Sequence, residues 1–264
     1  MNAKNIIALA AIALCASCSN IDENERFIDD GVVEPDANRC ILIEDFTGQN
    51  CPNCPDAMVK LDELHEAFGD AVVAVGIYGG PFGKTASGKY YPLTTETGDY
   101  YATQRNIQEQ PSGHFNRKVM STNASLWASI ATELLLQKSY VTILAENSFD
   151  SETRELTVWT KVSSMSDYSK TRLQVWLIED NVVSRQKLAD NSTNMEYVHN
   201  HVFRASVNDR DGEPITVSMN KEDVKKYTCT LSEEWNEKNM SIVAFVFNDE
   251  EVLQTVKIPV KTEN

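Results

Sequence analysis

Cys51-Pro52-Asn53-Cys54 is the segment of this 264-residue sequence whose residue types and spacing most clearly indicate chemistry. A two-residue spacer lets the second sulfur reach the first, so a mixed disulfide on the first thiol can be resolved within the chain. At the N-terminus of a helix, unpaired N–H groups and the helix dipole favour the thiolate over the thiol. The motif predicts a redox-active pair, with Cys51 as nucleophile and Cys54 as resolving thiol.

Two other interpretations of the pair stay open. A Cys-x-x-Cys segment is also half of many zinc sites, but zinc would need a second Cys or His pair at similar spacing. The one candidate, His199 and His201, is far away in the sequence. We therefore expect neither a metal nor a cofactor. The pair can also be a structural disulfide that does not turn over.

The flanking residues predict how the pair is positioned. Residues 40–46 form an apolar, β-rich run typical of a buried strand. Pro55 suits a first helical position, apolar residues then recur at spacings of four, three and four, and Gly69 suits a C-cap. Residues 71–78 predict a second buried strand. The order strand, Cys pair, helix, strand places the first Cys at the start of the helix.

This order resembles the thioredoxin fold. Asp45 and Phe46, six and five residues before Cys51, match the buried Asp and the following Phe of thioredoxins. The segment with Pro111, Gln110-Pro111-Ser112-Gly113, resembles the loop whose cis-proline faces the sulfurs. The resemblance implies that Asp45 accepts the proton of the second Cys and that Pro111 lies in the substrate loop. Asn50 stands directly before Cys51, where thioredoxins usually carry a Trp.

A narrower resemblance covers nearly all of the chain after its first segment. The segments that carry it are 43–48, 51–55, 111–113 with Asn116-Arg117, 197–204 and 242–248. In these segments the sequence is similar to the Bacteroidota lipoproteins named after a twenty-eight-kilodalton outer-membrane antigen. The family implies a thioredoxin-like domain joined to a β-rich domain at the outer membrane, and it implies no settled activity.

The first residues predict an export signal. Lys4 precedes an apolar run over residues 6–16, which is too short to span a bilayer. The run ends in Cys15-Ala16-Ser17-Cys18, which resembles a lipobox with Cys15 in place of the usual Leu. We expect residues 1–17 to be a lipoprotein signal peptide and Cys18 to carry a lipid such as palmitate; simple cleavage before a free Cys18 is the alternative.

Charge limits the partners of the chain. Lys and Arg number 24 against 39 Asp and Glu, a net charge of −15, which argues against nucleic acid because phosphate binding needs clustered cations. We expect the membrane to be reached through the N-terminal lipid, and the partner to be an envelope or surface protein. Residues 18–38 predict an acidic tether. Its acidic start resembles a surface-export signal, and a plain linker explains it equally well, so the periplasmic and surface faces both stay open.

Hydrophobic periodicity predicts an α+β protein of two domains. Residues 39–138 form the thioredoxin-like domain, with an inserted helix over 96–104 and a last helix over 123–138 whose core face is Leu126, Ile130 and Leu134. Residues 139–264 change to a period of two and predict seven or eight strands of an antiparallel, immunoglobulin-like sandwich. The apolar sets that alternate with polar residues include Leu156, Val158, Thr160 and Val162, and Leu173, Val175 and Leu177.

The remaining Cys and His residues carry weaker predictions. In an oxidising compartment Cys40 and Cys229 are left over and can bond, although two buried free thiols are the alternative. If residues 199–201 form a strand, His199 and His201 share a face. We expect them to pack and hydrogen-bond at the domain interface, although two imidazoles on one face can also bind a metal or a partner.

Together these patterns give two candidate functions. The first is a thiol–disulfide oxidoreductase of the cell envelope, with Cys51, Cys54, Asp45 and Pro111 as its site. The alternative is a non-enzymatic binding protein of the outer membrane, of receptor or adhesin type, in which the Cys pair is a structural disulfide.

Overall fold

The structure is a computed structural model that describes residues 39–261. The predicted signal peptide (1–17), the lipid site Cys18 and the tether (18–38) lie outside the described residues.

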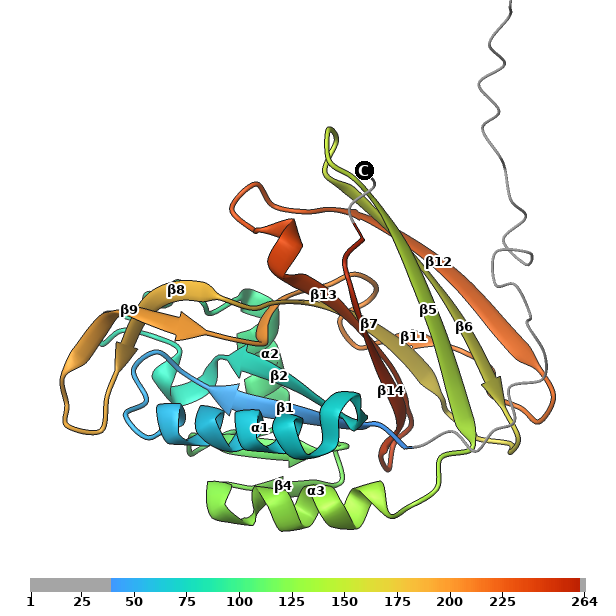
Figure 1. The fold of residues 1–264 in the computed structure, drawn as a ribbon, viewed down its shortest axis with the longest axis horizontal. Helices are drawn as coiled ribbons and strands as arrows, with labels where there is room; N and C mark the ends of the chain where they lie inside the picture. The colour runs from blue at the N-terminus through green and yellow to red at the C-terminus, as the bar shows by residue number, and fades with distance from the viewer. Residues whose placement is uncertain (1–38, 262–264) are drawn as a thin grey trace, which may run out of the picture.

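The described chain is α+β, as predicted, and it consists mostly of strands (Figure 1). Its helices are α1 (Cys54–Phe68), α2 (Glu96–Gln104) and α3 (Trp127–Leu135), with short 3-10 turns η1 (Gly69–Ala71), η2 (Gly80–Phe82), η3 (Ala124–Leu126) and η4 (Glu237–Asn239). Its strands are β1 (Ile41–Thr47), β2 (Val72–Tyr78), β3 (Ser112–Phe115), β4 (Val119–Ser121), β5 (Val141–Asp150), β6 (Glu155–Ser164), β7 (Arg172–Glu179), β8 (Val182–Lys187), β9 (Thr193–His199), β10 (Val202–Ser206), β11 (Glu213–Pro214), β12 (Glu222–Thr230), β13 (Met240–Phe247) and β14 (Val252–Pro259).

One nine-stranded sheet runs through the centre of the molecule. Its order is β14-β13-β7-β10-β2-β1-β3-β4, with β11 paired to β7. β1 and β2 are parallel, as the predicted strand–helix–strand order requires, and β3 is antiparallel to β1. β10 joins β2 through the pair Val202 and Gly76. Strands from both sides of the predicted boundary at 138/139 therefore share one sheet, and the division into two domains stays a prediction.

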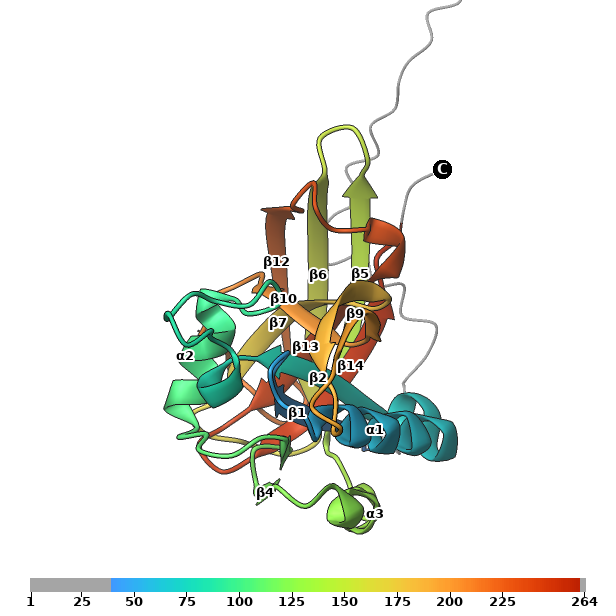
Figure 2. The same ribbon diagram turned by 90° about the vertical axis from the view of Figure 1, so that its left-hand side faces the viewer.

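A second sheet, β12-β6-β5, packs on the part of the large sheet that contains β7, β13 and β14 (Figure 2). The predicted inward set on β6 is confirmed, because Leu156, Val158, Thr160 and Val162 are all buried. β7 differs from the prediction: Gln174 and Trp176 are buried as well as Leu173, Val175 and Leu177. β7 lies inside the sheet, and its second face is covered by a cluster that includes residues of α2.

The helix predicted after the Cys pair and the last helix predicted over 123–138 both form, but the second is shorter than predicted and differs in orientation. α1 is followed by Gly69 at φ +56°, a conformation in which glycine is favoured. α3 buries Trp127, Ala131 and Leu134, whereas Leu126 is 49% exposed. The predicted core face of α3 is therefore wrong by one residue at its start. Asn123 caps the 3-10 turn η3 instead of the α-helix, so Leu126 precedes the first α-helical turn.

Candidate functional site

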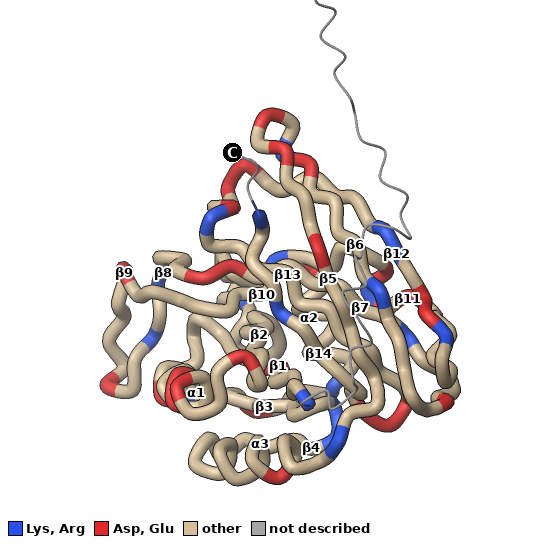
Figure 3. Tube along the Cα trace, turned by 45° about the vertical axis from the view of Figure 1, so that its right-hand side comes forward, with Lys and Arg blue, Asp and Glu red and all other residues tan. Residues whose placement is uncertain are grey.

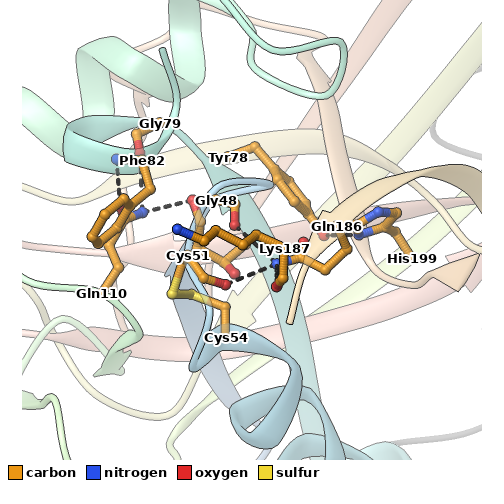
Figure 4. The surroundings of a disulfide bond; sticks show 11 residues. Gly48, Cys51, Cys54, Tyr78, Gly79, Phe82, Gln110, Gln186, Lys187 and His199 are labelled. Atoms are coloured by element: carbon orange, nitrogen blue, oxygen red, sulfur yellow. Dashed lines mark hydrogen bonds between the residues drawn. A yellow bond between two sulfur atoms is a disulfide. The ribbon is translucent and has the colours of Figure 1, made fainter. Parts of the chain in front are cut away.

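Cys51 and Cys54 form a disulfide at the N-terminus of α1, with their sulfurs 2.13 Å apart (Figure 4). Cys54 is the first residue of the helix, and the backbone N–H of Cys51 donates to the carbonyl oxygen of Gly48 at 3.0 Å. No side chain caps the helix at Asn53. The first N–H groups of α1 therefore remain available to a charge on the sulfurs.

The disulfide is buried. Cys51 is 0% exposed and Cys54 is 4% exposed, so little of the pair is open to a reagent in solution in this conformation. The turn η2 approaches the loop before the pair closely. A Cβ on Gly48 would lie 2.7 Å from the Cβ and the carbonyl oxygen of Phe82, so only glycine fits there without a shift of the backbone.

Asp45 lies inside the sheet on β1, paired with Gly76 of β2 and Gly113 of β3. Its side chain is fully buried, and neither carboxylate oxygen has a hydrogen-bond partner among the described residues. Burial raises the pKa of Asp45 to about 7. Near neutral pH this carboxyl group is therefore divided between its protonated and charged forms and can exchange a proton.

Pro111 follows a cis peptide bond with Gln110. The Gln110 amide fixes this loop, since it donates to the carbonyl oxygens of Thr47 (2.6 Å) and Gly79 (3.0 Å). Gln110 and Pro111 also line an open cavity of about 310 Å³ together with residues 53, 56 and 57 of the Cys pair and α1. The structure thus places Pro111 beside the start of α1.

A residue far along the chain also reaches the pair, and sequence reasoning missed it. The side-chain amide of Gln186, on β8, donates to the carbonyl oxygen of Cys51 at 2.8 Å (Figure 4). Gln186 is buried, with 3% of its surface exposed. No sequence motif indicates a role for Gln186, because a single Gln in a polar strand belongs to no recognisable spacing of residues.

The two neighbouring histidines do not share a face. His199 ends β9 and its Nδ1 lies 2.8 Å from the hydroxyl oxygen of Tyr78, whereas His201 adopts φ +56° and its Nδ1 lies 3.1 Å from Asp180. The predicted common face is wrong because the strand ends between them. Burial lowers the pKa of His199 to about 4. Within residues 39–261 no group of three His, Cys, Asp or Glu could hold a metal ion.

Cys40 and Cys229 are not bonded to each other. Cys40 precedes β1 in the large sheet, and its backbone N–H donates to the side chain of Gln254 at 2.9 Å. Cys229 is a free thiol on β12 in the three-stranded sheet, and burial raises its pKa to about 11. The predicted disulfide is therefore wrong: the two residues belong to different sheets, and the neutral thiol of Cys229 is favoured where it lies.

Charged residues are spread over the surface. Figure 3 shows acidic residues on α1 and on the turn between β5 and β6, with Lys and Arg interspersed among acidic residues along β12. The excess negative charge is therefore not confined to one element.

The sequence model described as "Outer membrane protein Omp28" matches residues 98–264. The chain belongs to the Omp28 family. It is accordingly an outer membrane protein of the cell envelope. The matched region contains Pro111, Gln186 and all strands from β3 onward, whereas the Cys pair precedes it. No helix of the described residues is long and apolar enough to cross a membrane.

Solved structures resemble parts of this Omp28-family fold. HBP35 of Porphyromonas gingivalis aligns with a TM-score of 0.66 and 13% identity, over 86% of this chain and 77% of that chain. A protein of Agrobacterium tumefaciens aligns with a TM-score of 0.53 and 13% identity, over 85% and 96%. A domain of the outer membrane lipoprotein Omp28 of Porphyromonas gingivalis shares 24% identity over 48% of this chain and 92% of that chain, with a TM-score of 0.36. No curated protein matches the chain.

Proposed function

We propose that this outer membrane protein is a thiol–disulfide oxidoreductase whose redox centre is the Cys51–Cys54 pair. The observation that carries the proposal is the position of the disulfide at the uncapped N-terminus of α1, with the buried carboxyl of Asp45 on the preceding strand. A helix N-terminus stabilises a thiolate, and a carboxyl with a pKa of about 7 can give or take a proton at neutral pH.

The exchange starts from the oxidised pair that the structure contains. A substrate thiolate attacks the Sγ of Cys51, and the Sγ of Cys54 leaves with the bonding electrons. Protonated Asp45 gives its proton to this leaving thiolate. A second substrate thiolate then attacks the substrate sulfur and displaces the Cys51 thiolate. The substrate loses two electrons and gains a disulfide, and the pair is left reduced. In the reverse direction Asp45 accepts the Cys54 proton.

The finer description of the fold supports this proposal. The parallel β1 and β2, joined by α1, with the antiparallel β3 and β4 beyond them, have the arrangement of a thioredoxin-like unit, in which Pro111 precedes β3. The three-stranded sheet β12-β6-β5 packs on strands β7, β13 and β14 of the large sheet. These two layers have the arrangement of an immunoglobulin-like sandwich. We assign these two fold types to the N-terminal and C-terminal parts of the chain.

Trapping of mixed disulfides tests the proposal. Cys54→Ser leaves Cys51 able to attack a substrate disulfide but removes the thiol that resolves the product, so covalent complexes with envelope proteins should accumulate. We expect at least about tenfold more complexes than in Cys51→Ser, measured by non-reducing electrophoresis of alkylated cells, because Cys51→Ser lacks the thiol that makes the first attack. Equal and negligible trapping in both variants would refute turnover.

Burial of the disulfide favours a second candidate, a binding protein in which the Cys pair only stabilises the fold. Since Cys51 is 0% exposed, a static pair of this kind would act as a staple between the loop before α1 and the helix. Both Cys variants would then lose stability without trapping any protein, and partner binding would survive. The same two variants therefore separate the candidates.

We further propose that a lipid on Cys18 holds the protein at the outer membrane. The support is the lipobox-like segment before Cys18 and the family to which the chain belongs. Cys18→Ser should abolish labelling by a fatty-acid analogue and release the protein into the soluble fraction, because the lipid supplies the apolar surface that inserts into the membrane. Unchanged labelling in that variant would remove the lipid from Cys18.

A further inference from the structure

The β8–β9 hairpin stands apart from the sheets that build the rest of the molecule. Its two strands pair only with each other among the described residues, from Val182 opposite His199 to Lys187 opposite Thr193. Figure 1 shows the hairpin extending past the end of β1 and α1, away from the three-stranded sheet. It is therefore not held by a strand ladder to either sheet.

The hairpin nevertheless binds the loop that carries the Cys pair. Gln186 donates to the carbonyl oxygen of Cys51 at 2.8 Å, and the backbone N–H of Lys187 donates to the carbonyl oxygen of Gln49 at 3.0 Å. The side-chain amide of Gln49 donates in return to Ser184 Oγ and the Arg185 carbonyl oxygen, both at 2.9 Å. In the view of Figure 4 the Lys187 side chain lies in front of Cys51.

Tyr197, on the second strand of the hairpin, lies near α1. Burial, followed by the nearby charges of Asp62 and Asp56 on α1, raises the pKa of Tyr197. The same strand ends at His199, whose ring lies 2.8 Å from the Tyr78 hydroxyl. Together with the contacts of β8, these place the hairpin over the site in which Cys51 is 0% exposed.

The ends of the hairpin have the geometry of a pivot. Asn181 adopts φ +59° and His201 adopts φ +56°, so a left-handed residue lies on each side of the two strands. Each is also held by a neighbouring side chain: Asn181 N–H donates to Asn200 Oδ1 at 3.0 Å, and His201 N–H donates to Asp180 Oδ1 at 2.6 Å. These bonds fix the base. The rest of the hairpin is held by its hydrogen bonds to the loop of the Cys pair and by Arg185, whose guanidinium lies 4.6 Å from the ring centre of Tyr91.

We propose that the β8–β9 hairpin is a displaceable cover over the Cys51–Cys54 disulfide, latched by Gln186 and Gln49, and that the pair reacts only when the hairpin lifts. The biological consequence rests on the proposed function, because an oxidoreductase with a closed site exchanges thiols only after a partner or a fluctuation opens it. A structural disulfide would need no such opening.

The rate at which a small phosphine reduces the disulfide of the full chain tests the cover. Gln186→Ala removes the hydrogen bond to the Cys51 carbonyl oxygen. In the closed state this oxygen is then left without a partner, whereas in the open state water can bind it, so the open state is favoured. The loss of one buried hydrogen bond should make reduction about tenfold faster. Thr193→Ala is the matched control, since Thr193 is exposed on the same hairpin. We expect it to reduce at the wild-type rate. Equal rates for all three proteins would overturn the proposal.

Two measurements on the unaltered protein keep the proposal testable if Gln186→Ala does not fold. Low concentrations of urea should change the reduction rate little, because lifting a hairpin exposes far less surface than unfolding. The Lys187 amide should exchange its hydrogen faster than the amides of β1. The proposal would be overturned if the reduction rate depended on urea as strongly as global unfolding does. It would also be overturned if the Lys187 amide were as protected from exchange as the amides of β1.

Failure of the cover and failure of the proposed function give different results. If Gln186→Ala speeds reduction but Cys54→Ser still traps nothing when the two changes are combined, the hairpin is a cover and the oxidoreductase is refuted. If Cys54→Ser traps partners and Gln186→Ala changes neither reduction nor trapping, the oxidoreductase stands and the cover is refuted.

Discussion

Asp45→Asn should stabilise the oxidised protein at pH 8 and have little effect at pH 4. The folded-state pKa of Asp45 is about 7, above the value of about 3.9 for an unfolded Asp, because the charged form is buried without a partner. Between these two values the folded protein binds more protons than the unfolded chain, so the contribution of Asp45 to stability falls as pH rises through this range. Asn is neutral throughout and avoids this loss.

The expected gain is about 4 kcal/mol at pH 8, as an upper figure, from a shift of roughly three pKa units. Urea unfolding of both proteins with the disulfide intact, at pH 4, 6 and 8, measures it. Glu66→Gln on the exposed side of α1 is the control and should differ from the wild type by the same small amount at every pH. If the difference in free energy of unfolding between Asp45→Asn and the wild type does not change with pH, the argument that burial raises the pKa of Asp45 is contradicted.

This result would bear on function. A buried carboxyl that lowers stability at neutral pH does not stabilise the fold, since an amide of the same shape would give a more stable protein. Sites of chemistry are where such costs are found. If Asp45→Asn also slows resolution of mixed disulfides on Cys51, the loss of stability and the proton transfer would be traced to the same group.

The site as far as α1 could be predicted because its signals are local. The buried strand over 41–47, the Cys pair, Pro55 and the C-cap at Gly69 follow one another within thirty residues, and each acts through its own backbone conformation. The inserted helix predicted over 96–104 has those bounds in the structure, where Thr95 caps it by accepting a hydrogen bond from Gly98 N–H.

The remainder depends on contacts between distant residues. Gln186 meets Cys51 across 135 positions, and nothing in the residues around either predicts that they meet. Periodicity on β7 predicted one buried face, but a cluster that includes Tyr101 and Ala102 of α2 covers the second face of the sheet, so Trp176 is buried too. Only the packing of distant elements on that face determines this burial, and the alternation of apolar and polar residues along one strand does not report it.

Arg117→Ala should destabilise the protein by about 3–5 kcal/mol at pH 7, because it leaves a buried carboxylate unpaired. Glu44 lies on β1 with 1% of its side chain exposed, and its Oε1 accepts bonds from Arg117 Nε (2.9 Å) and Nη2 (2.8 Å). Burial raises the pKa of Glu44, but the charges of Arg117 and then Arg105 outweigh it and hold the pKa below its usual value. The guanidinium also lies 4.4 Å from the ring centre of Phe247, so its planar face is packed as well.

A double-mutant cycle separates the charge from the packing. Glu44→Gln in the Arg117→Ala background should recover part of the lost stability, since an amide leaves no buried charge. The Arg117→Ala deficit should also shrink toward pH 4, where the unpaired Glu44 gains a proton in the folded state. Lys60→Ala, which breaks the exposed pair between Lys60 and Glu63, is the control and should cost less than about 1 kcal/mol. An Arg117→Ala cost no larger than that of Lys60→Ala would mean that the buried pair does not hold β1 against the turn after β3.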